Sequence, residues 1–163
     1  MNKTDLPRLE TQRLILEPMR EDAVRALIAH CESADPELAQ AYAEMLDGAV
    51  RNPAEYLWYI PWSFFLRESG ARIGDASFKG WADGRPEIGY GLEPEYWNRG
   101  YATEGVLALC RWAFSEQSAA AVEAETAPDN AASQRVLEKL RFRPTGETGE
   151  EGPRFVLYPD AWK

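Results

Sequence analysis

The segment PEYWNRGYATEGVLALCRWAF, residues 94–114, places an Arg-Gly pair directly ahead of an apolar pattern with helical spacing. The first amides of an α-helix lack partners within the helix and, together with the helix dipole, favour an anion. Gly100 lets the backbone approach such an anion closely, Arg99 adds a cation and Thr103 adds a hydroxyl donor. The segment therefore indicates a phosphate or pyrophosphate site, although a tight strand-to-helix turn with an exposed arginine explains the local pattern equally well. One apolar stripe is expected to face the core: Val106, Leu109, Cys110, Ala113 and Phe114.

The preceding segment PEIGYGL, residues 86–92, is predicted to be a strand with an unusual face. Because side chains alternate along a strand, Glu87, Gly89 and Gly91 share one face, and Tyr90 points to the other. A narrow ligand could lie along the bare face with its phosphates at the helix start; crowding by a neighbouring helix is the alternative. The glycine spacing fits neither a P-loop nor the dinucleotide-binding fingerprint.

Periodicity and turn residues predict a single domain over residues 1–163, with the element order β-α-α-β-β-β-α-β-α-β-β. The central three strands are joined by short turns, which suggests an antiparallel meander. Strands are expected at 13–19, 57–68, 71–80, 86–93, 120–127, 141–146 and 153–158. Helices are expected at 20–33, from 35 to about 50, after Gly100, and at 130–140.

The composition limits the possible ligands. The chain has 27 acidic and 18 basic side chains and a net charge of −9, which argues against general nucleic-acid binding. The acidic excess either attracts cationic ligands such as amines or only confers solubility. No membrane-spanning apolar run and no signal peptide is found, so we expect a soluble, cytoplasmic protein without a membrane partner.

The cysteines and the histidine give no sign of a metal site. Cys31 and Cys110 each fall within an apolar helical pattern and are expected to be buried free thiols. His30 is the only histidine and is expected to be a helix-terminus residue rather than a catalyst. No spacing of cysteine and histidine suggests zinc, so no metal is expected.

Two longer patterns carry a resemblance to a known family. EIGYGLEPEYWNRGYATEGV (87–106), followed by VEAETAPDNAASQRVLEKLRF (122–142), resembles the GNAT superfamily of acyl-CoA-dependent N-acyltransferases. The opening LETQRLILEPM (9–19) is similar to its RimJ/RimL-type branch of ribosomal-protein-alanine N-acetyltransferases. The resemblance covers nearly the whole chain. It implies an α+β (α/β) fold with a mixed, mostly antiparallel central sheet of about seven strands, flanked by helices and splayed in the middle to admit acetyl-CoA.

The resemblance also implies a set of cofactor-binding residues. Backbone amides from Arg99 to Thr103 would hold the CoA pyrophosphate, and the backbone of Gly91 and Leu92 would pair with the pantetheine arm. The loop comprises Trp97, Asn98, Arg99, Gly100, Tyr101, Ala102 and Thr103. Asn130 resembles the family's cofactor-facing asparagine, although it could be only a helix cap. Ser133 resembles the residue near the CoA sulfur, although it could be only a polar residue of the first helical turn.

Two departures from the family pattern bear on the chemistry. The segment EKLRFRPTGE, residues 138–147, lacks the tyrosine that protonates the leaving thiolate in many members, so Ser133 or a water is left as proton donor. Arg141 stands where the family usually has glycine, so it must bear a left-handed conformation or the helix ends differently. Glu87 is the first candidate for the general base and Glu125 the second, because burial could raise the pKa of a carboxyl towards the working range. The alternative for Glu87 is a solvated strand carboxylate.

The expected reaction is transfer of an acetyl group from acetyl-CoA to a primary amine, either a peptide N-terminus or a small molecule. The alternatives are a catalytically quiet acyl-CoA-binding domain and a nucleotide-binding interaction module that uses the same anion loop. By resemblance, residues 35–62 form one wall of the acceptor pocket, and the protein is a monomer or homodimer. The candidate wall aromatics, which could equally be core residues, are Tyr42, Tyr56, Trp58, Tyr59 and Trp62.

Overall fold

The computed structural model describes residues 5–162. Within this range the strands form a five-stranded antiparallel sheet of order β1-β2-β3-β4-β5 and a three-stranded antiparallel sheet of order β6-β8-β7. The strands are β1 (Leu9–Glu10), β2 (Leu14–Pro18), β3 (Trp62–Leu66), β4 (Arg72–Phe78), β5 (Ile88–Leu92), β6 (Val122–Glu125), β7 (Arg143–Thr148) and β8 (Pro153–Leu157). The helices are α1 (Glu21–Cys31), α2 (Pro36–Arg51), α3 (Tyr101–Ser115) and α4 (Ala131–Lys139). The predicted element order and the α/β class are confirmed, with β1 added and the strands divided between two sheets.

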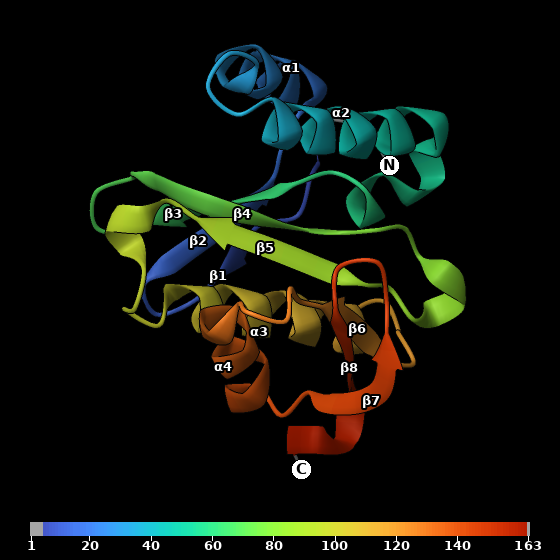
Figure 1. Cartoon of the computed structure of the whole chain (residues 1–163). Helices are drawn as coiled ribbons and strands as arrows, with labels where there is room; N and C mark the ends of the chain where they lie inside the picture. Colours follow the sequence, from blue (N-terminus) through green and yellow to red (C-terminus); the bar gives the residue numbers. More distant parts are fainter. Residues whose placement is uncertain (1–4, 163) are drawn as a thin grey trace.

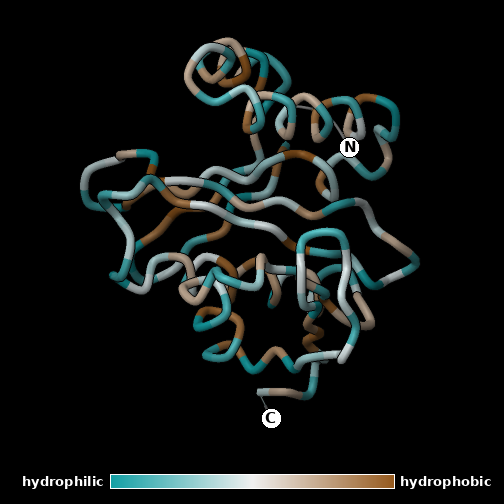
Figure 2. The backbone as a smooth tube through the Cα atoms, in the orientation of Figure 1, coloured by the Kyte–Doolittle hydropathy of each residue, from teal (hydrophilic) through white to brown (hydrophobic). Residues whose placement is uncertain are grey.

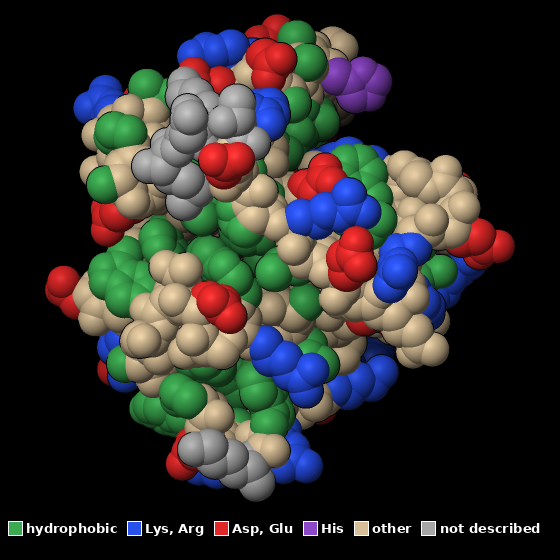
Figure 3. Space-filling model, turned by 180° about the vertical axis from the view of Figure 1, so that it is seen from behind, with side chains coloured by type: hydrophobic (Ala, Val, Ile, Leu, Met, Phe, Trp, Pro, Cys, Tyr) green, Lys and Arg blue, Asp and Glu red, His purple; other side chains and the backbone are tan. Residues whose placement is uncertain are grey.

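The helices lie in two layers around the larger sheet (Figure 1). In this view, helices α1 and α2 lie above the larger sheet and α3 lies below it. Helix α4 and the smaller sheet lie in the lower part of the view, below β5. The most hydrophobic positions gather in the strands and on the inner turns of the helices, and hydrophilic positions follow the outer turns and loops (Figure 2). His30 lies exposed in the last turn of α1, as predicted for a helix-terminus residue (Figure 3).

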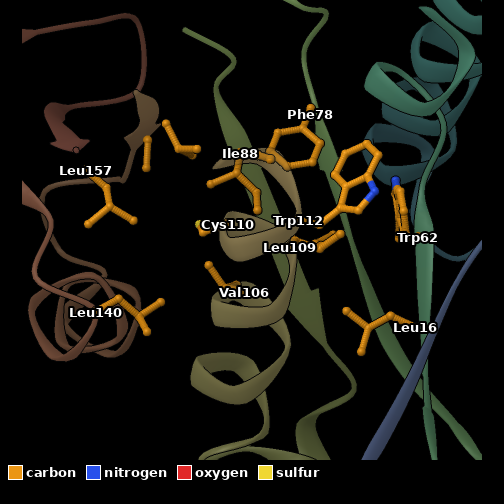
Figure 4. Packing of buried hydrophobic residues seen from close by; sticks show 14 of the residues in the cluster. Leu16, Trp62, Phe78, Ile88, Val106, Leu109, Cys110, Trp112, Leu140 and Leu157 are labelled. Carbon is orange, nitrogen blue, oxygen red and sulfur yellow. The ribbon is translucent and has the colours of Figure 1, made fainter. Parts of the chain in front are cut away.

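The predicted stripe of α3 faces the main core. Val106, Leu109, Cys110 and Ala113 are fully buried, whereas Phe114 is only partly buried. Figure 4 shows this helix packed among side chains from both sheets. An aromatic cluster fills the space between α3 and β3, with the rings of Trp58, Trp62, Phe78, Trp81 and Trp112 in contact. The two cysteines are buried free thiols, as predicted.

The strand predicted at 57–68 is wrong in its first part. Pro53–Trp58 forms a 3₁₀ segment, and the strand begins only at Trp62. The Trp62 indole N–H donates to the Leu57 carbonyl at 3.1 Å. Leu57 and Trp58 are therefore buried, but they belong to an irregular segment and not to a hydrogen-bonded strand. An apolar, aromatic composition therefore indicated burial correctly and strand conformation incorrectly.

The end of α4 shows the strain expected from the missing glycine. Arg141 has a φ of 68°, in the left-handed region that glycine adopts readily. Its guanidinium donates to the Ala161 carbonyl at 3.0 Å, a contact that only a long side chain can make. This bond offsets part of the cost of the left-handed conformation.

The two sheets meet at one end of β5 and diverge from there. A parallel bridge joins Glu87 to Glu123, and the Glu123 amide donates to the Pro86 carbonyl at 2.9 Å. Beyond this point, β5 pairs with β4 and β6 pairs with β8 among the described residues. The strands are therefore splayed in the middle, between β5 and β6, as the resemblance to the GNAT superfamily implied.

A cluster of charges closes the joined end of the two strands. The Glu87 carboxylate accepts from Lys79 Nζ at 2.7 Å and from an Arg154 Nη2 at 2.9 Å. Arg154, on β8, also lies 3.5 Å from Glu125 and 3.9 Å from Glu123 on β6. The side chains of Glu87 and Arg154 are only 17% and 24% exposed, so water screens these pairs less than it screens surface pairs. We call these five residues the charge clamp.

We predict that Glu87→Gln destabilises the fold by about 1–3 kcal/mol at pH 7, because it removes charged hydrogen bonds to Lys79 and Arg154. Burial raises the pKa of Glu87, but the hydrogen bonds and charges of Lys79 and Arg154 outweigh burial and lower that pKa below its ordinary value of 4.5. A carboxyl whose pKa is lower in the folded than in the unfolded state stabilises the fold above the unfolded pKa. That stabilisation is lost as the pH falls through the folded pKa.

Urea unfolding of both proteins between pH 7 and pH 3 measures this effect. The difference in unfolding free energy should be largest above about pH 5 and should shrink at lower pH. Glu138→Gln, at an exposed position of α4, is the matched control and should change stability by less than about 0.5 kcal/mol. A difference that stays constant with pH would contradict the charge clamp.

Candidate functional site

The loop ahead of α3 has the predicted geometry of an anion site. Gly100 is the residue before the helix and has a φ of 81°, while Asn98 has a φ of 60°. The Glu104 amide donates to the Gly100 carbonyl, so the amides of residues 101–103 precede the intrahelical ladder. Gly100, Tyr101, Ala102 and Thr103 line a cavity of about 590 Å³. Glycine is needed here because the left-handed conformation is costly for other residues.

The cavity brings together most of the predicted cofactor-binding residues. Its lining includes Gly91, Leu92, Trp97, Asn98, Gly100, Tyr101, Ala102, Thr103, Asn130 and Ser133. Arg99 is not part of the lining, so its predicted contribution rests on the backbone rather than on the cation. Arg135 and Lys139 of α4 line the cavity instead. Their i, i+4 spacing was the available sequence signal for two cations on one helix face.

Arg13 stabilises the loop ahead of α3, and the sequence patterns did not predict this role. Its guanidinium donates to the Arg99 carbonyl at 2.9 Å and to Glu104 at 2.7 Å, and it lies 4.3 Å from the centre of the Tyr101 ring. Burial raises the pKa of Glu104, but hydrogen bonds from Thr11 and Arg13 outweigh burial and lower it. The segment before β2 thus fixes both the loop and the first turn of α3.

The pairing of β5 with β4 determines which backbone groups of β5 face the gap between β5 and β6. Lys79 donates to the Glu87 carbonyl and Glu93 to the Ile73 carbonyl, in one constant antiparallel register. Alternation then directs the N–H and C=O groups of Gly91 towards β4, and those of Tyr90 and Leu92 towards β6. The predicted pairing of the Gly91 backbone with a ligand in the gap is therefore wrong. Successive residues of a strand direct their N–H and C=O groups to opposite edges, so the neighbours of Gly91 face the gap instead. The Leu92 carbonyl accepts from the Trp97 indole at 2.8 Å.

Gly89 and Gly91 nevertheless open the predicted face of β5. A Cβ atom built on either residue meets nothing within 4 Å. Crowding by a neighbouring helix, the alternative explanation for the two glycines, is therefore wrong. The space beside them is available to a ligand.

A second cavity, of about 920 Å³, opens on the face of β5 that carries Glu87, Gly89 and Gly91. Tyr42 and Tyr59 line it, as predicted for the wall formed by residues 35–62. Tyr56, Trp58 and Trp62 are absent from the described lining. Tyr56 donates to the Met19 carbonyl at 2.6 Å, while the two tryptophans belong to the core cluster, so these three predictions for the wall are wrong.

Acidic side chains dominate the second cavity. Its acidic lining residues are Asp35, Glu44, Asp75, Glu87, Glu93, Glu125 and Glu151, against the basic residues Arg72 and Lys79. Asp75 is buried and accepts from the Tyr42 hydroxyl and from Arg72, each at 2.6 Å. Burial and the neighbouring Asp75 raise the pKa of the Tyr42 phenol, which therefore stays a neutral donor.

The two candidate bases differ in their surroundings. Glu87 and Glu125 both line the second cavity, but the net pKa of Glu87 is lowered although burial raises it, so the expected pKa near the working range is wrong for Glu87. The reason is that Lys79 and Arg154 bind its carboxylate directly. Glu125 is more deeply buried, with 6% of its side chain exposed, and its nearest cation is Arg154 at 3.5 Å.

Asn130 and Ser133 lie where both cavities meet. Asn130 Oδ1 accepts from the Ser133 amide at 3.0 Å, so the helix-cap alternative for Asn130 is correct. Both residues also line both cavities, so capping does not remove them from the site. Tyr90 lines both cavities too, and its hydroxyl lies 2.9 Å from Ser133 Oγ. The sequence reasoning placed no tyrosine here, because it looked for one after α4 and not across the gap on β5.

Two findings concern other ligand classes. Among residues 5–162 there is no group of three or more His, Cys, Asp or Glu side chains placed to hold a metal ion. No helix in the same range combines the length and apolar character needed to cross a membrane.

Comparison with known proteins identifies the family. Residues 13–143 match the family model described as Acetyltransferase (GNAT) domain. The chain belongs to this GNAT family. The uncharacterized N-acetyltransferase YoaA of Bacillus subtilis is 31% identical over 152 residues, which cover 86% of this chain and 85% of YoaA. The chain is thus an N-acetyltransferase.

Solved structures share the GNAT fold. The ribosomal-protein-S5-alanine acetyltransferase of Vibrio fischeri superimposes with a TM-score of 0.72 at 18% identity, covering 96% of this chain and 99% of that one. The ribosomal L7/L12 alpha-N-protein acetyltransferase RimL gives a TM-score of 0.74 at 16% identity, with 94% of each chain covered. At these identities the likeness establishes the fold and leaves the acceptor open.

Proposed function

We propose that this N-acetyltransferase transfers an acetyl group from acetyl-CoA to a primary amine by direct attack of the amine on the thioester. The observation that carries the proposal is the meeting of two cavities across one open strand edge. One cavity contains the start of α3, whose first amides have no helical partner, and the other has an acidic lining. Their common lining includes Tyr90, Gly91, Leu92, Asn130 and Ser133.

The first cavity fits CoA in charge and shape. The amides of residues 101–103 and the dipole of α3 favour the pyrophosphate, and Arg135 and Lys139 add positive charge opposite them. The outward groups of Tyr90 and Leu92 offer backbone hydrogen bonds to an extended amide-bearing arm, as an added strand would receive. These features support acetyl-CoA as the donor more than ATP or GTP, which have no such arm.

When bound, acetyl-CoA supplies an activated acetyl group as a thioester, and the residues of the chain supply orientation and proton transfer. The acceptor must lose a proton as it attacks, because amines are mostly protonated at neutral pH. We assign this step to Glu125, directly or through water, since Lys79 and Arg154 occupy the oxygens of Glu87 and lower its pKa, which makes Glu87 a weaker base. Ser133 lies on the opposite side of the junction and serves the leaving sulfur.

The second cavity supports an amine acceptor. Its acidic lining favours an ammonium group over an anionic or neutral ligand. The neighbouring structures named as ribosomal-protein acetyltransferases support a peptide N-terminus as one candidate, and a small amine is the other. A monomer or homodimer in solution remains our expectation.

We predict acetyl-CoA-dependent release of free CoA in the presence of amines or N-terminal peptides. Glu125→Gln and Ser133→Ala should each lower kcat by about 100-fold or more, because each removes a proton-transfer group. The KM for acetyl-CoA should stay within about threefold, since neither side chain belongs to the pyrophosphate loop. Glu138→Gln is the control and should keep the wild-type rate.

The same assay separates the alternatives. If CoA raises the melting temperature but no amine or peptide releases thiol, the protein is a binding domain and the proposal is wrong. If ATP or GTP raises the melting temperature and CoA does not, the anion loop serves a nucleotide and the proposal is also wrong.

A separate prediction concerns the open strand face. Gly91→Ala should change the unfolding free energy by less than about 0.5 kcal/mol, because its Cβ meets no atom within 4 Å. The new methyl group enters the wall shared by both cavities, so kcat/KM should fall by about tenfold or more, which corresponds to about 1.4 kcal/mol. Urea unfolding and the CoA-release assay measure the two effects, and unchanged kcat/KM would exclude this face from the site.

A further inference from the structure

Tyr90 presents a phenol at the point where the two cavities meet. It comes from β5, and its hydroxyl reaches across the gap to the first turn of α4. The oxygen lies 2.9 Å from Ser133 Oγ and 3.2 Å from the Ser133 carbonyl. Tyr90 and Ser133 both line the two cavities, so this hydroxyl pair stands between a donor site and an acceptor site.

The chemistry at this junction requires an acid of suitable strength. Breaking the thioester C–S bond leaves an alkyl thiolate, a base of at least the strength of the cysteine thiolate, whose conjugate thiol has a pKa of about 8.5. A phenol with an ordinary pKa of about 10 is close to that value, whereas an aliphatic alcohol is a far weaker acid. Ser133 alone is therefore a poor proton source, even though it is well placed.

We propose that Tyr90 is the acid that protonates the leaving thiolate, with Ser133 passing the proton. The proposal rests on the acetyl transfer described above. As the C–S bond breaks, its electron pair goes to sulfur. The Ser133 hydroxyl proton moves to sulfur, and Ser133 Oγ takes the phenolic proton of Tyr90. Water in the open cavity reprotonates the Tyr90 phenolate after the products leave.

The surroundings hold both hydroxyls ready for this transfer. The Asn130 side chain accepts from the Ser133 amide and so fixes the first turn of α4. Any negative charge that develops on Ser133 Oγ lies at the N-terminus of this helix, where the dipole stabilises it. Burial raises the pKa of Tyr90, so the phenol enters each cycle protonated, and the hydrogen bond with Ser133 opposes that rise and so favours release of the proton.

On the core side, the surroundings of the Tyr90 ring are apolar and uncharged. Cys110 of α3 lies behind it, and burial raises the pKa of that thiol well above its usual range. The thiol therefore stays uncharged and does not compete for the proton. The 2.9 Å contact with Ser133 is the shortest hydrogen bond that Tyr90 makes within residues 5–162.

Four variants test the proposal: Tyr90→Phe, Ser133→Ala, Ser133→Thr and the double variant of Tyr90→Phe with Ser133→Ala. Tyr90→Phe should lower kcat by about 100-fold and change the Kd for CoA by less than about twofold, because only the acid is removed. The double variant should be no slower than the slower single variant, because the two hydroxyls act in one relay. Ser133→Thr, which keeps a hydroxyl, should retain more activity than Ser133→Ala. Tyr158→Phe removes an exposed phenol outside the described lining of both cavities and should keep the wild-type kcat.

A solvent deuterium isotope effect on kcat separates proton transfer from packing. The wild type should show an effect that changes in Tyr90→Phe, whereas a packing role would leave it unchanged. If Tyr90→Phe is less stable, the isotope effect is measured below the melting temperature of the variant, and its interpretation is the same. A Tyr90→Phe enzyme with wild-type kcat, or singles whose effects multiply in the double variant, would overturn the relay. An inactive wild type would instead overturn the acetyl transfer itself.

Discussion

The constraint on which the site depends is the separation of two strands that start from a shared bridge. Glu87 and Glu123 pair at one end, and the charge clamp around Arg154 holds that end closed. From there β5 keeps β4 as its partner and β6 keeps β8, so the facing edges stay apart. Exposed strand edges usually invite further pairing, and this edge lies inside the molecule where a ligand can use it.

This separation puts three chemical features within one junction. The helix start of α3 provides unpaired amides, α4 provides Arg135 and Lys139, and the acidic cavity adjoins the same stretch of β5. Arg13 stabilises the loop by binding the Arg99 carbonyl and Glu104 together. In the proposed reaction, donor, acceptor and proton relay therefore meet at this junction.

Sequence patterns predicted the order of the elements and the tight turn ahead of α3 because both depend on local features. The α3 stripe follows from helical periodicity, and the Gly100 turn follows from the need for a left-handed residue ahead of a helix. The sequence could not assign roles that depend on contacts across the fold. Glu87 faces the cavity as expected, but Lys79 and, from 67 residues away, Arg154 bind its carboxylate and lower its pKa.

The same limit explains the other errors in the site. Tyr90 meets Ser133 across a separation of 43 residues, which no spacing rule reveals. The phase of the β5 hydrogen bonds, which turns the Gly91 backbone away from the gap, depends on pairing with β4 rather than on β5 itself. Trp58 and Trp62 were expected beside the acceptor because aromatic residues suit either a core or a pocket.

The most direct test of the central claim is a crystal structure of the protein with CoA. The account predicts pyrophosphate oxygens within about 2.7–3.2 Å of the amides of residues 101–103. It also predicts an arm that follows the free edge of β5, with the sulfur beside Ser133. Density for CoA elsewhere, or strands β5 and β6 joined by a continuous hydrogen-bond ladder in the complex, would contradict it.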